Sequence, residues 1–459
     1  MRNWREGEVK IPRTFRQAMR SKQAHEWHEA MLKNGSVTVK RSGQHFIITR
    51  WIFDVNVDEM GYVIRFRARL VARGFRQIAG VDFDDTFSPV ARMSSFRLLL
   101  ALAILKDFLV KHDYTRSTRP NGLRQSGKEW NDELDAWFKA NGFIQCRSEL
   151  CLYFYSENDT IAFVLVYVDG LICAPNSEDF KCGIFDKLGK DYGIKDLGLL
   201  HKYLGIRKSQ SINNIMLKRY WHDLDSNSSA IPMETTLRLE ACKQKNDGEC
   251  KHDQDQIGYH EVVGCLMYLV TSTRPDLMYA VGQLSRYVNH PTEKHVDSAK
   301  RVLRYVLGTT GKGITYRKSN TCDIGIRLDG YSDSDWGNDK DTRKRGGAIS
   351  WASRRQTIVA QSTAEAEYVA ACEAVMEGRA LMNILNELLP EVKRKLTLGV
   401  DNHSSYVIAP SPTFSRRTRH IELKWHFVRE QFEKKHLYTW KVRSEDNPAD
   451  LFTKPLAKV

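Results

Sequence analysis

Four acidic residues in the last third of the sequence have the types and spacing that metal-dependent phosphodiester hydrolysis requires. They occupy four separate short segments: Asp333, Glu365, Asp401 and Asp450. Two-metal cleavage needs several carboxylates converging on two hard cations about 3.5–4 Å apart, one activating water and the other stabilising the leaving 3′ oxygen. Because one helix face cannot surround two ions, acids drawn from separate elements fit this requirement.

Each acid also has a purely structural explanation. Ser362 and Glu365 match an S-x-x-E capping box, in which the glutamate closes a helix start. Asp401 and Asp450 lie at a predicted strand end and a predicted helix start, where acids commonly satisfy backbone donors. Asp333 fits a turn. The four segments occur together and in this order, which favours the metal site.

The elements around the acids predict a compact α/β domain. Apolar residues alternate at 324–328 and again at 396–400, which indicates two strands. Segments 348–351 and 357–359 form a predicted hairpin. A long helix with one buried face is expected after Ser362.

Composition favours a class of partner but no particular reaction. The 459 residues carry 70 Lys and Arg against 56 Asp and Glu, a formal net charge of +14. This excess favours a polyanion such as nucleic acid, the alternative being a basic surface that serves only solubility. Apolar residues make up 42% of the chain, enough for packed cores. At about 100–200 residues per domain, the length predicts two to four domains.

Membrane and secretory classes are disfavoured. The longest apolar run, 98–105, is far shorter than the roughly 18–20 residues of a membrane span. Residues 1–20 carry charges throughout, so no signal peptide is expected. Nine scattered cysteines without zinc spacing favour a reduced, intracellular compartment. The sequence does not separate a cytoplasmic particle from the nucleus.

The hydrophobic pattern upstream predicts a mixture of helices and strands. Helices are expected over 14–31, 96–109, 259–287 and 295–307, and strands over 44–53, 62–71 and 161–168. The two strands before residue 72 form a predicted hairpin. The stretch 223–256 is rich in Ser, Asn, Asp and Lys, which predicts a linker or a damaged loop.

The acidic segments carry a specific family resemblance. They read GYSDSDW (330–336), STAEAEY (362–368), VDN (400–402) and NPADLFTK (447–454), with RTRHI at 417–421. Together they resemble the ribonuclease H domain of copia-type retrotransposon polyproteins. The resemblance implies that the four acids named above bind two divalent ions, Mg²⁺ or Mn²⁺. Asp335 competes with Asp333 as a ligand, because it lies two residues away. Glu367 competes with Glu365 for the same reason.

The upstream part resembles the reverse transcriptase of the same family. Matching segments are RFRARLVARGF (65–75), TFSPV (86–90), YVDG (167–170), YLGI (203–206) and TRPDL (273–277). The resemblance implies the α/β fold class, as a multidomain α+β protein. Remnants of the fingers and palm of a right-hand polymerase would precede a ribonuclease H-like α/β domain. The implied domains are 1–222 for fingers and palm, 223–256 for the linker or damaged loop, 257–320 for a helical thumb- or connection-like region, and 321–459 for the ribonuclease H-like domain.

Two departures from the family affect the polymerase chemistry. The family uses one palm aspartate, matched here by Asp113, and two adjacent aspartates in a Tyr-x-Asp-Asp turn. This turn keeps Asp169, but Gly170 replaces the second aspartate, which weakens a cation site of about three carboxylates. Only eight residues separate Asp113 from Gly122, so an internal deletion is expected near 114–121. At about 3.5 Å per residue, these eight residues are too short to form the segment that the family has at this place. Polymerase activity is therefore expected to be impaired or lost.

Basic residues in two segments are predicted to contact nucleic acid: Arg69, Arg73, Arg417, Arg419 and His420. The positively charged side chains would neutralise phosphates of the nucleic acid. The protein would recognise the shape of the duplex, and the 2′-OH groups would distinguish the RNA strand. The expected partners are RNA, DNA and RNA–DNA hybrids, with no membrane partner; the oligomeric state stays open. A non-catalytic nucleic-acid-binding relic is the alternative function. A hydrolase of acidic or glycosidic substrates built on paired carboxylates ranks third, because it explains neither the basic segments nor the family-like motifs.

Overall fold

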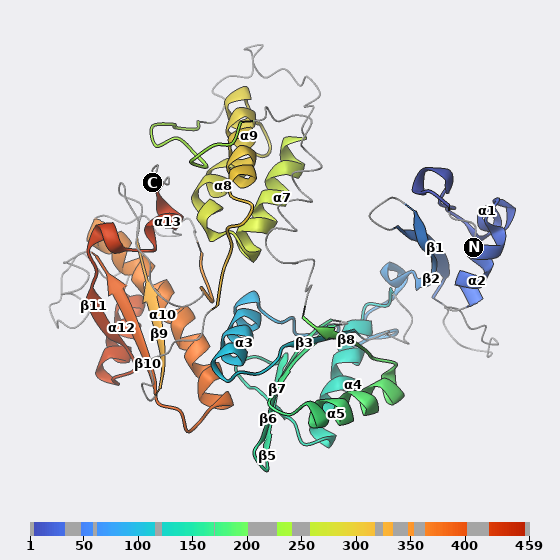
Figure 1. The fold of residues 1–459 in the computed structure, drawn as a ribbon, viewed down its shortest axis with the longest axis horizontal. Coiled ribbons are helices and arrows are strands. Elements are labelled where there is room, and N and C mark those ends of the chain that lie inside the picture. Colours follow the sequence, from blue (N-terminus) through green and yellow to red (C-terminus); the bar gives the residue numbers. More distant parts are fainter. Residues whose placement is uncertain are drawn as a thin grey trace.

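The computed structural model describes residues 4–32, 47–57, 62–114, 122–168, 170–200, 227–240, 258–316, 325–333, 348–352, 363–401 and 422–454. Figure 1 shows four units: an N-terminal hairpin unit at the right, a central sheet unit, a helical unit above it, and a C-terminal sheet unit at the left. The predicted mixed α/β class is confirmed. In these ranges, no helix combines the length and the apolar character needed to cross a bilayer.

The N-terminal unit packs short helices against a two-stranded antiparallel hairpin. Its elements are η1 (Glu6–Glu8), α1 (Phe15–Arg20), α2 (Ala24–Leu32), β1 (Thr49–Val57) and β2 (Val63–Ala72). Trp27 is fully buried between the helices and the hairpin and makes edge contacts with the rings of Phe53 and Phe66, at 5.3 and 4.7 Å. The single helix predicted over 14–31 is two helices, because the N–H and hydroxyl of Ser21 both donate to the carbonyl of Ala18 and end α1.

The central unit is a six-stranded antiparallel sheet in the order β4-β5-β6-β7-β3-β8. Its strands are β3 (Lys111–Tyr114), β4 (Ile144–Gln145), β5 (Leu152–Glu157), β6 (Thr160–Tyr167), β7 (Gly170–Pro175) and β8 (Lys195–Leu199). Its helices are η2 (Gly74–Arg76), α3 (Met93–Leu105), α4 (Ser126–Ala140) and α5 (Glu178–Tyr192). Phe163 and Leu165 of β6 share a core with α3, whereas Ala162 and Val164 share one with α4 and α5. Burial on both faces explains the continuous apolar run that predicted this strand.

The helical unit contains α7 (Tyr259–Ser272), η5 (Pro275–Leu277), α8 (Met278–Ser285) and α9 (Glu293–Gly308). The single helix predicted over 259–287 is broken at Pro275, because proline cannot continue the hydrogen-bond ladder of a preceding helix. Met233 is buried in the core of these helices. The described part of the predicted linker, 227–240, therefore packs on this unit.

The C-terminal unit is a parallel three-stranded sheet in the order β11-β10-β9. Its strands are β9 (Ile326–Tyr331), β10 (Arg394–Val400) and β11 (Tyr438–Lys441), and its helices are α10 (Thr363–Leu388), α12 (Glu422–Glu433), η7 (Ser444–Asp446) and α13 (Asp450–Thr453). The long α10 packs against the sheet (Figure 1). The described residues 348–352 form no strand, and their predicted hairpin partner lies outside the described residues.

One arginine joins the central, helical and C-terminal units. Arg97 of α3 donates to the carbonyls of Thr271 and Ser272 at the end of α7 and to that of Ile349. Its guanidinium lies 3.6 Å from the ring centroid of Trp351. The indole N–H of Trp351 in turn donates to a carbonyl of α7 at 3.1 Å. These contacts tie the C-terminal sheet unit to the central and helical units.

Candidate metal centre

The register of the parallel sheet brings two predicted ligands together. Gly399 of β10 pairs with Tyr331 of β9, so the residues two positions further along each strand leave the sheet side by side. These residues are Asp401 and Asp333. Because the carboxyl ends of parallel strands meet at one edge, acids that follow β9 and β10 converge there.

A glutamate of α10 completes this group. Ligand oxygens of Asp333, Glu367 and Asp401 all lie within 4.8 Å of one another. Glu367 is buried near the start of α10, which crosses from β9 to β10. The group thus contains Glu367, the competitor of Glu365; the side chain of Glu365 and the whole of Asp335 lie outside the described residues.

The fourth predicted acid, Asp450, lies beside this group and is paired with a lysine. Asp450 begins α13 and is only 7% exposed. Its Oδ1 accepts a hydrogen bond from Lys454 Nζ at 2.9 Å, and the same ammonium lies 3.5 Å from Asp333 Oδ2. The structure therefore connects Asp450 to Asp333 through Lys454, which the sequence analysis did not single out.

Two further residues position the acids, and the sequence analysis missed both. Thr453 donates from its hydroxyl to Asp333 Oδ2. Asn447 donates from Nδ2 to the carbonyl of Ser332 at 2.9 Å and accepts from the N–H of Ala449 at 3.1 Å. Asn447 therefore fastens the chain before α13 to the end of β9. Both lie in the NPADLFTK segment, whose polar residues around Asp450 were the available signal.

Burial controls the charge of the acids. Burial raises the pKa of Asp333, against the opposing effects of the Thr453 hydroxyl and the Lys454 ammonium. Burial likewise raises the pKa of Asp450 to about 6. Although burial disfavours its charged form, the hydrogen bond to Asp450 and the neighbouring carboxylates raise the pKa of Lys454. Burial thus disfavours the ionised forms of Asp333 and Asp450, and the Lys454 ammonium partly offsets that effect.

The donor set fits a hard divalent cation. Asp401 Oδ1 and Asp450 Oδ2 are buried and have no hydrogen-bond partner among the described residues. Buried carboxylate oxygens without partners are costly, and a cation would compensate them. Oxygen-only ligands suit Mg²⁺ and Mn²⁺ rather than softer metals.

Of the two predicted polymerase acids, Asp113 lies on β3 of the central sheet. Asp113 of β3 pairs with Leu171 of β7, and β7 begins directly after Asp169, at Gly170. The turn between β6 and β7 has Val168 in the left-handed region, with φ 50°, and the indole of Trp130 donates to its carbonyl at 3.0 Å. The side chain of Asp113 and the whole of Asp169 lie outside the described residues.

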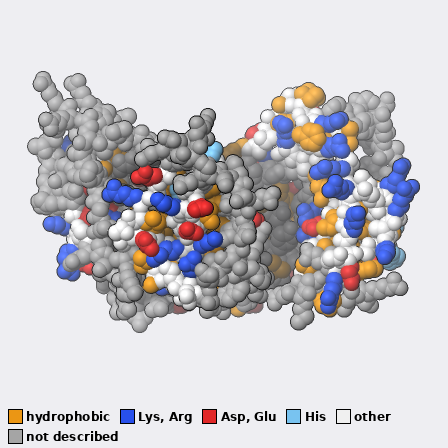
Figure 2. All heavy atoms as spheres, turned by 90° about the horizontal axis from the view of Figure 1, so that it is seen from above, with side chains coloured by type: hydrophobic (Ala, Val, Ile, Leu, Met, Phe, Trp, Pro, Cys, Tyr) orange, Lys and Arg blue, Asp and Glu red, His pale blue; other side chains and the backbone are white. Residues whose placement is uncertain are grey.

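The predicted basic residues are only partly described. Arg69 is exposed on β2 and Arg73 follows this strand half-buried. In the hairpin register, Arg65 and Arg67 alternate with buried or half-buried apolar residues and share the outer face with Arg69. Figure 2 shows Lys and Arg side chains gathered on the right-hand body, where this unit lies. Arg417, Arg419 and His420 lie outside the described residues.

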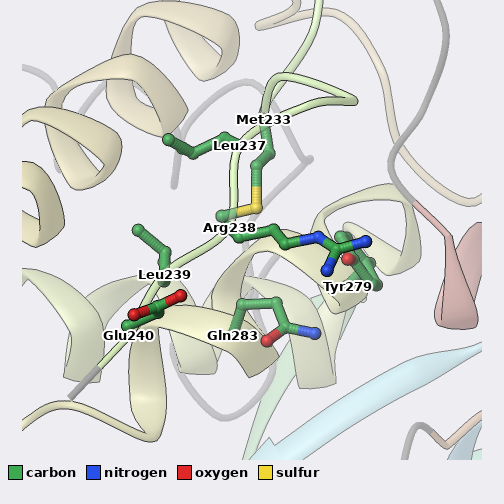
Figure 3. Close-up of a pocket in the computed structure, with 7 residues that line it drawn as sticks. All are labelled: Met233, Leu237, Arg238, Leu239, Glu240, Tyr279 and Gln283. Carbon is green, nitrogen blue, oxygen red and sulfur yellow. The ribbon is translucent and has the colours of Figure 1, made fainter.

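A cavity of about 310 Å³ lies in the helical unit, remote in sequence from the acids. Figure 3 shows its lining, with the side chains of Arg238 and Glu240 beside Tyr279 and Gln283 of α8. It brings together no group of carboxylates comparable with the one at the edge of the parallel sheet.

Comparison with known proteins identifies the family. The family described as "Reverse transcriptase (RNA-dependent DNA polymerase)" matches residues 36–119 and 114–224. A putative transposon Ty5-1 protein of Saccharomyces cerevisiae is 31% identical over 56% of this chain and 86% of its own length. The retrovirus-related Pol polyproteins from transposon RE1 of Arabidopsis thaliana and transposon TNT 1-94 of Nicotiana tabacum are each 30% identical, over 97% and 93% of this chain.

The chain belongs to the copia-type retrotransposon Pol family. It spans about a third of the length of the two Pol polyproteins, 34% of one and 36% of the other. The reverse transcriptase match covers the β1–β2 hairpin and the central sheet unit, but not the helices α1 and α2. The acidic group of the C-terminal unit lies beyond that match.

Proposed function

We propose that the C-terminal unit is a ribonuclease H-like domain that hydrolyses the RNA strand of RNA–DNA hybrids with two divalent cations, Mg²⁺ or Mn²⁺. The observation that carries this proposal is the convergence of Asp333, Glu367 and Asp401 at one edge of a parallel sheet. Asp450 lies beside them, linked by Lys454 to Asp333. Four acids from four segments supply the carboxylates that a two-cation site needs.

The residues of the chain bind and orient the reacting groups. Asp333 is shared between the three-acid group and the Lys454 ammonium, and the Thr453 hydroxyl fixes one of its oxygens. Divalent cations held there would supply water activation and charge stabilisation for the phosphodiester. The expected products are a 5′-phosphate and a 3′-hydroxyl.

The glutamate ligand of this proposed site is Glu367 rather than Glu365. Residues two apart on an α-helix point about 200° away from each other, so one of the two faces the acids and the other faces away. Glu367 lies within reach of Asp333 and Asp401. For Glu365, the S-x-x-E sequence pattern with Ser362 still predicts a capping role.

The nucleic acid is expected to contact the arginine face of the N-terminal hairpin. Arg65, Arg67 and Arg69 place three guanidinium groups on one side of β2, where they can neutralise phosphates without reading bases. Arg73, Arg417, Arg419 and His420 remain proposed contacts. The substrates would be RNA, DNA and RNA–DNA hybrids.

The polymerase half of the chain is proposed to be inactive. Gly170 stands where the family has its second turn aspartate, and the family match breaks into two segments that overlap at 114–119, within the region of the proposed deletion. A primer-extension assay with an RNA template, Mg²⁺ and all four deoxynucleotides should therefore give no product above a no-protein control. Extension to full length would show that Asp113 and Asp169 suffice and would overturn this part of the proposal.

Hydrolysis of a labelled RNA–DNA hybrid tests the nuclease. The full chain with Mg²⁺ or Mn²⁺ should cleave the RNA strand, and Asp333→Asn should reduce the rate at least about 100-fold, because it removes a charged ligand rather than an outer-shell partner. Asp446→Asn, which breaks an ion pair with the exposed Arg443 next to the site, is the matched control and should retain activity.

Absence of cleavage by the unmodified chain, with salt-sensitive hybrid binding retained, would instead support the alternative function. The protein would then be a non-catalytic, nucleic-acid-binding relic of a transposable element. Its affinity would fall steeply with salt concentration, because phosphate contacts release counterions.

A further inference from the structure

A lysine without a role in the proposed chemistry lies inside the carboxylate cluster. Lys454 Nζ is 2.9 Å from Asp450 Oδ1 and 3.5 Å from Asp333 Oδ2. The side chains of Lys454, Asp450 and Asp333 are only 8%, 9% and 2% exposed. An exposed ion pair four residues apart contributes little, but a lysine buried this deeply requires carboxylates around it. The ammonium therefore bridges two acids that the proposed site needs.

The cluster is asymmetric around this lysine. Asp333, Glu367 and Asp401 form a compact group that offers one cation three carboxylates. Asp450 is not part of that group, and its Oδ1 is held by Lys454. A second cation that used Asp450 would have to bind close to the Lys454 ammonium, which lies on the other oxygen of the same carboxylate. Asp450 Oδ2, buried and without a hydrogen-bond partner among the described residues, stays available to it.

The net charge of the cluster also disfavours a second cation when no substrate is bound. With all four carboxyl groups ionised and Lys454 protonated, the cluster would have three excess negative charges, which one divalent cation reduces to one. A second divalent cation alone would make the cluster positive. A substrate phosphodiester would bring the one negative charge that restores neutrality, so the second cation and the substrate favour each other's binding.

We propose that Lys454 is a built-in counter-cation of the site. It holds Asp450 and Asp333 together when no metal is bound, and it weakens binding of the second divalent cation until a substrate phosphate arrives. Lys454 is thus a positioning residue that orders cation and substrate binding. This inference rests on the proposed two-cation function of the same acids.

Counting bound Mn²⁺ on the full chain without nucleic acid tests the proposal directly. Electron paramagnetic resonance of free Mn²⁺ should give one tight and one weak site for the unmodified chain. Lys454→Met, which keeps an unbranched side chain, one atom shorter, but removes its charge, should bind the second Mn²⁺ at least about tenfold more tightly. Lys434→Met, which removes an exposed lysine of the C-terminal unit paired with Glu430, should behave like the unmodified chain.

Thermal unfolding supplies the second measurement. In EDTA, Lys454→Met should unfold at a lower temperature than the unmodified chain, because Asp450 and Asp333 lose their shared counter-charge, and Mn²⁺ should raise this temperature more than it does for the unmodified chain. If Lys454→Met does not fold in EDTA, Lys454→Gln, which keeps a hydrogen-bond donor, replaces it in the Mn²⁺ titration. This variant is also expected to bind the second Mn²⁺ more tightly than the unmodified chain.

The outcomes separate this inference from the proposed function. If the unmodified chain binds Mn²⁺ and cleaves the hybrid but Lys454→Met leaves the second affinity unchanged, the counter-cation role is overturned and the nuclease stands. Weaker second binding in Lys454→Met would also overturn it, because the lysine would then only support the fold. If the unmodified chain neither binds Mn²⁺ nor cleaves the hybrid, the proposed function itself fails.

Discussion

Replacing Glu367 by Gln should reduce the rate of hybrid cleavage at least about 100-fold, because it removes a charged ligand of the three-acid group. Loss of a residue that only supports a metal ligand already costs about 10–100-fold, so loss of the ligand itself should cost at least as much. Glu365→Gln should leave the rate within about twofold, since helix-surface substitutions away from a site have small effects. The two variants make the same chemical change two residues apart on one helix. Their difference therefore measures which glutamate faces the acids.

The measurement is the initial rate of RNA-strand cleavage at saturating Mg²⁺, together with circular dichroism to establish that both variants keep their fold. Titration of Mn²⁺ adds an independent readout, since Glu367→Gln should weaken the tight site and Glu365→Gln should not. Loss of cleavage in Glu365→Gln with activity kept in Glu367→Gln would overturn the proposed ligand set. Equal losses would mean that Glu365 also acts on the site.

The positions of the aspartates could be predicted from sequence because they depend on strand ends. Asp333 and Asp401 each follow an alternating apolar segment, and strands of a parallel sheet end at the same edge. The choice between Glu365 and Glu367 depends on the rotation of α10 about its axis, which tertiary packing sets. A motif that contains both residues carries no information on that rotation.

Lys454 could not be recognised from sequence for a related reason. A lysine four residues after an aspartate in a helical segment is ordinarily a solvent-exposed pair. Here Asn447 fastens the chain before α13 to the end of β9, which brings this helix turn against Asp333 and buries the pair. The burial arises from a contact between segments more than a hundred residues apart.

The fold was predicted best where one face of an element is buried throughout. The hairpin β1–β2, the doubly buried β6 and the long α10 all follow their apolar patterns. The four-residue β11 was missed, because Tyr438 and its neighbours are half-exposed and too few to show alternation. The break between α7 and α8 was also missed, although Pro275 marks it, because apolar residues continue on both sides.

That break contains the most deeply buried charged side chain among the described residues, Arg274. Arg274 is 0% exposed and makes two hydrogen bonds to the carboxylate of Asp276, at 2.9 and 2.8 Å. It also donates to the carbonyl and hydroxyl of Thr309 at the end of α9. Tyr305 donates its hydroxyl to Asp276 at 3.1 Å. Every partner of this guanidinium helps to connect α7, η5 and α9.

Arg274→Met should therefore destabilise the helical unit by about 3–5 kcal/mol, because it leaves the Asp276 carboxylate partly buried without its counter-charge. Urea unfolding of the full chain, followed by hydrogen exchange of α7 and α9 amides, measures the loss. The matched control is Arg301→Met in the same unit, whose ion pair with Glu234 is more exposed, at 32% and 50%, and should contribute less than about 1 kcal/mol.

Replacing both partners distinguishes a lost charge pair from lost packing. Arg274→Met combined with Asp276→Leu removes the unpaired carboxylate, so the double variant should be more stable than Arg274→Met alone, since apolar replacements of buried pairs are often neutral. A single-variant loss below about 1 kcal/mol would show that water or another cation compensates Asp276. A double variant no more stable than the single one would assign the loss to packing of the Arg274 side chain against α9.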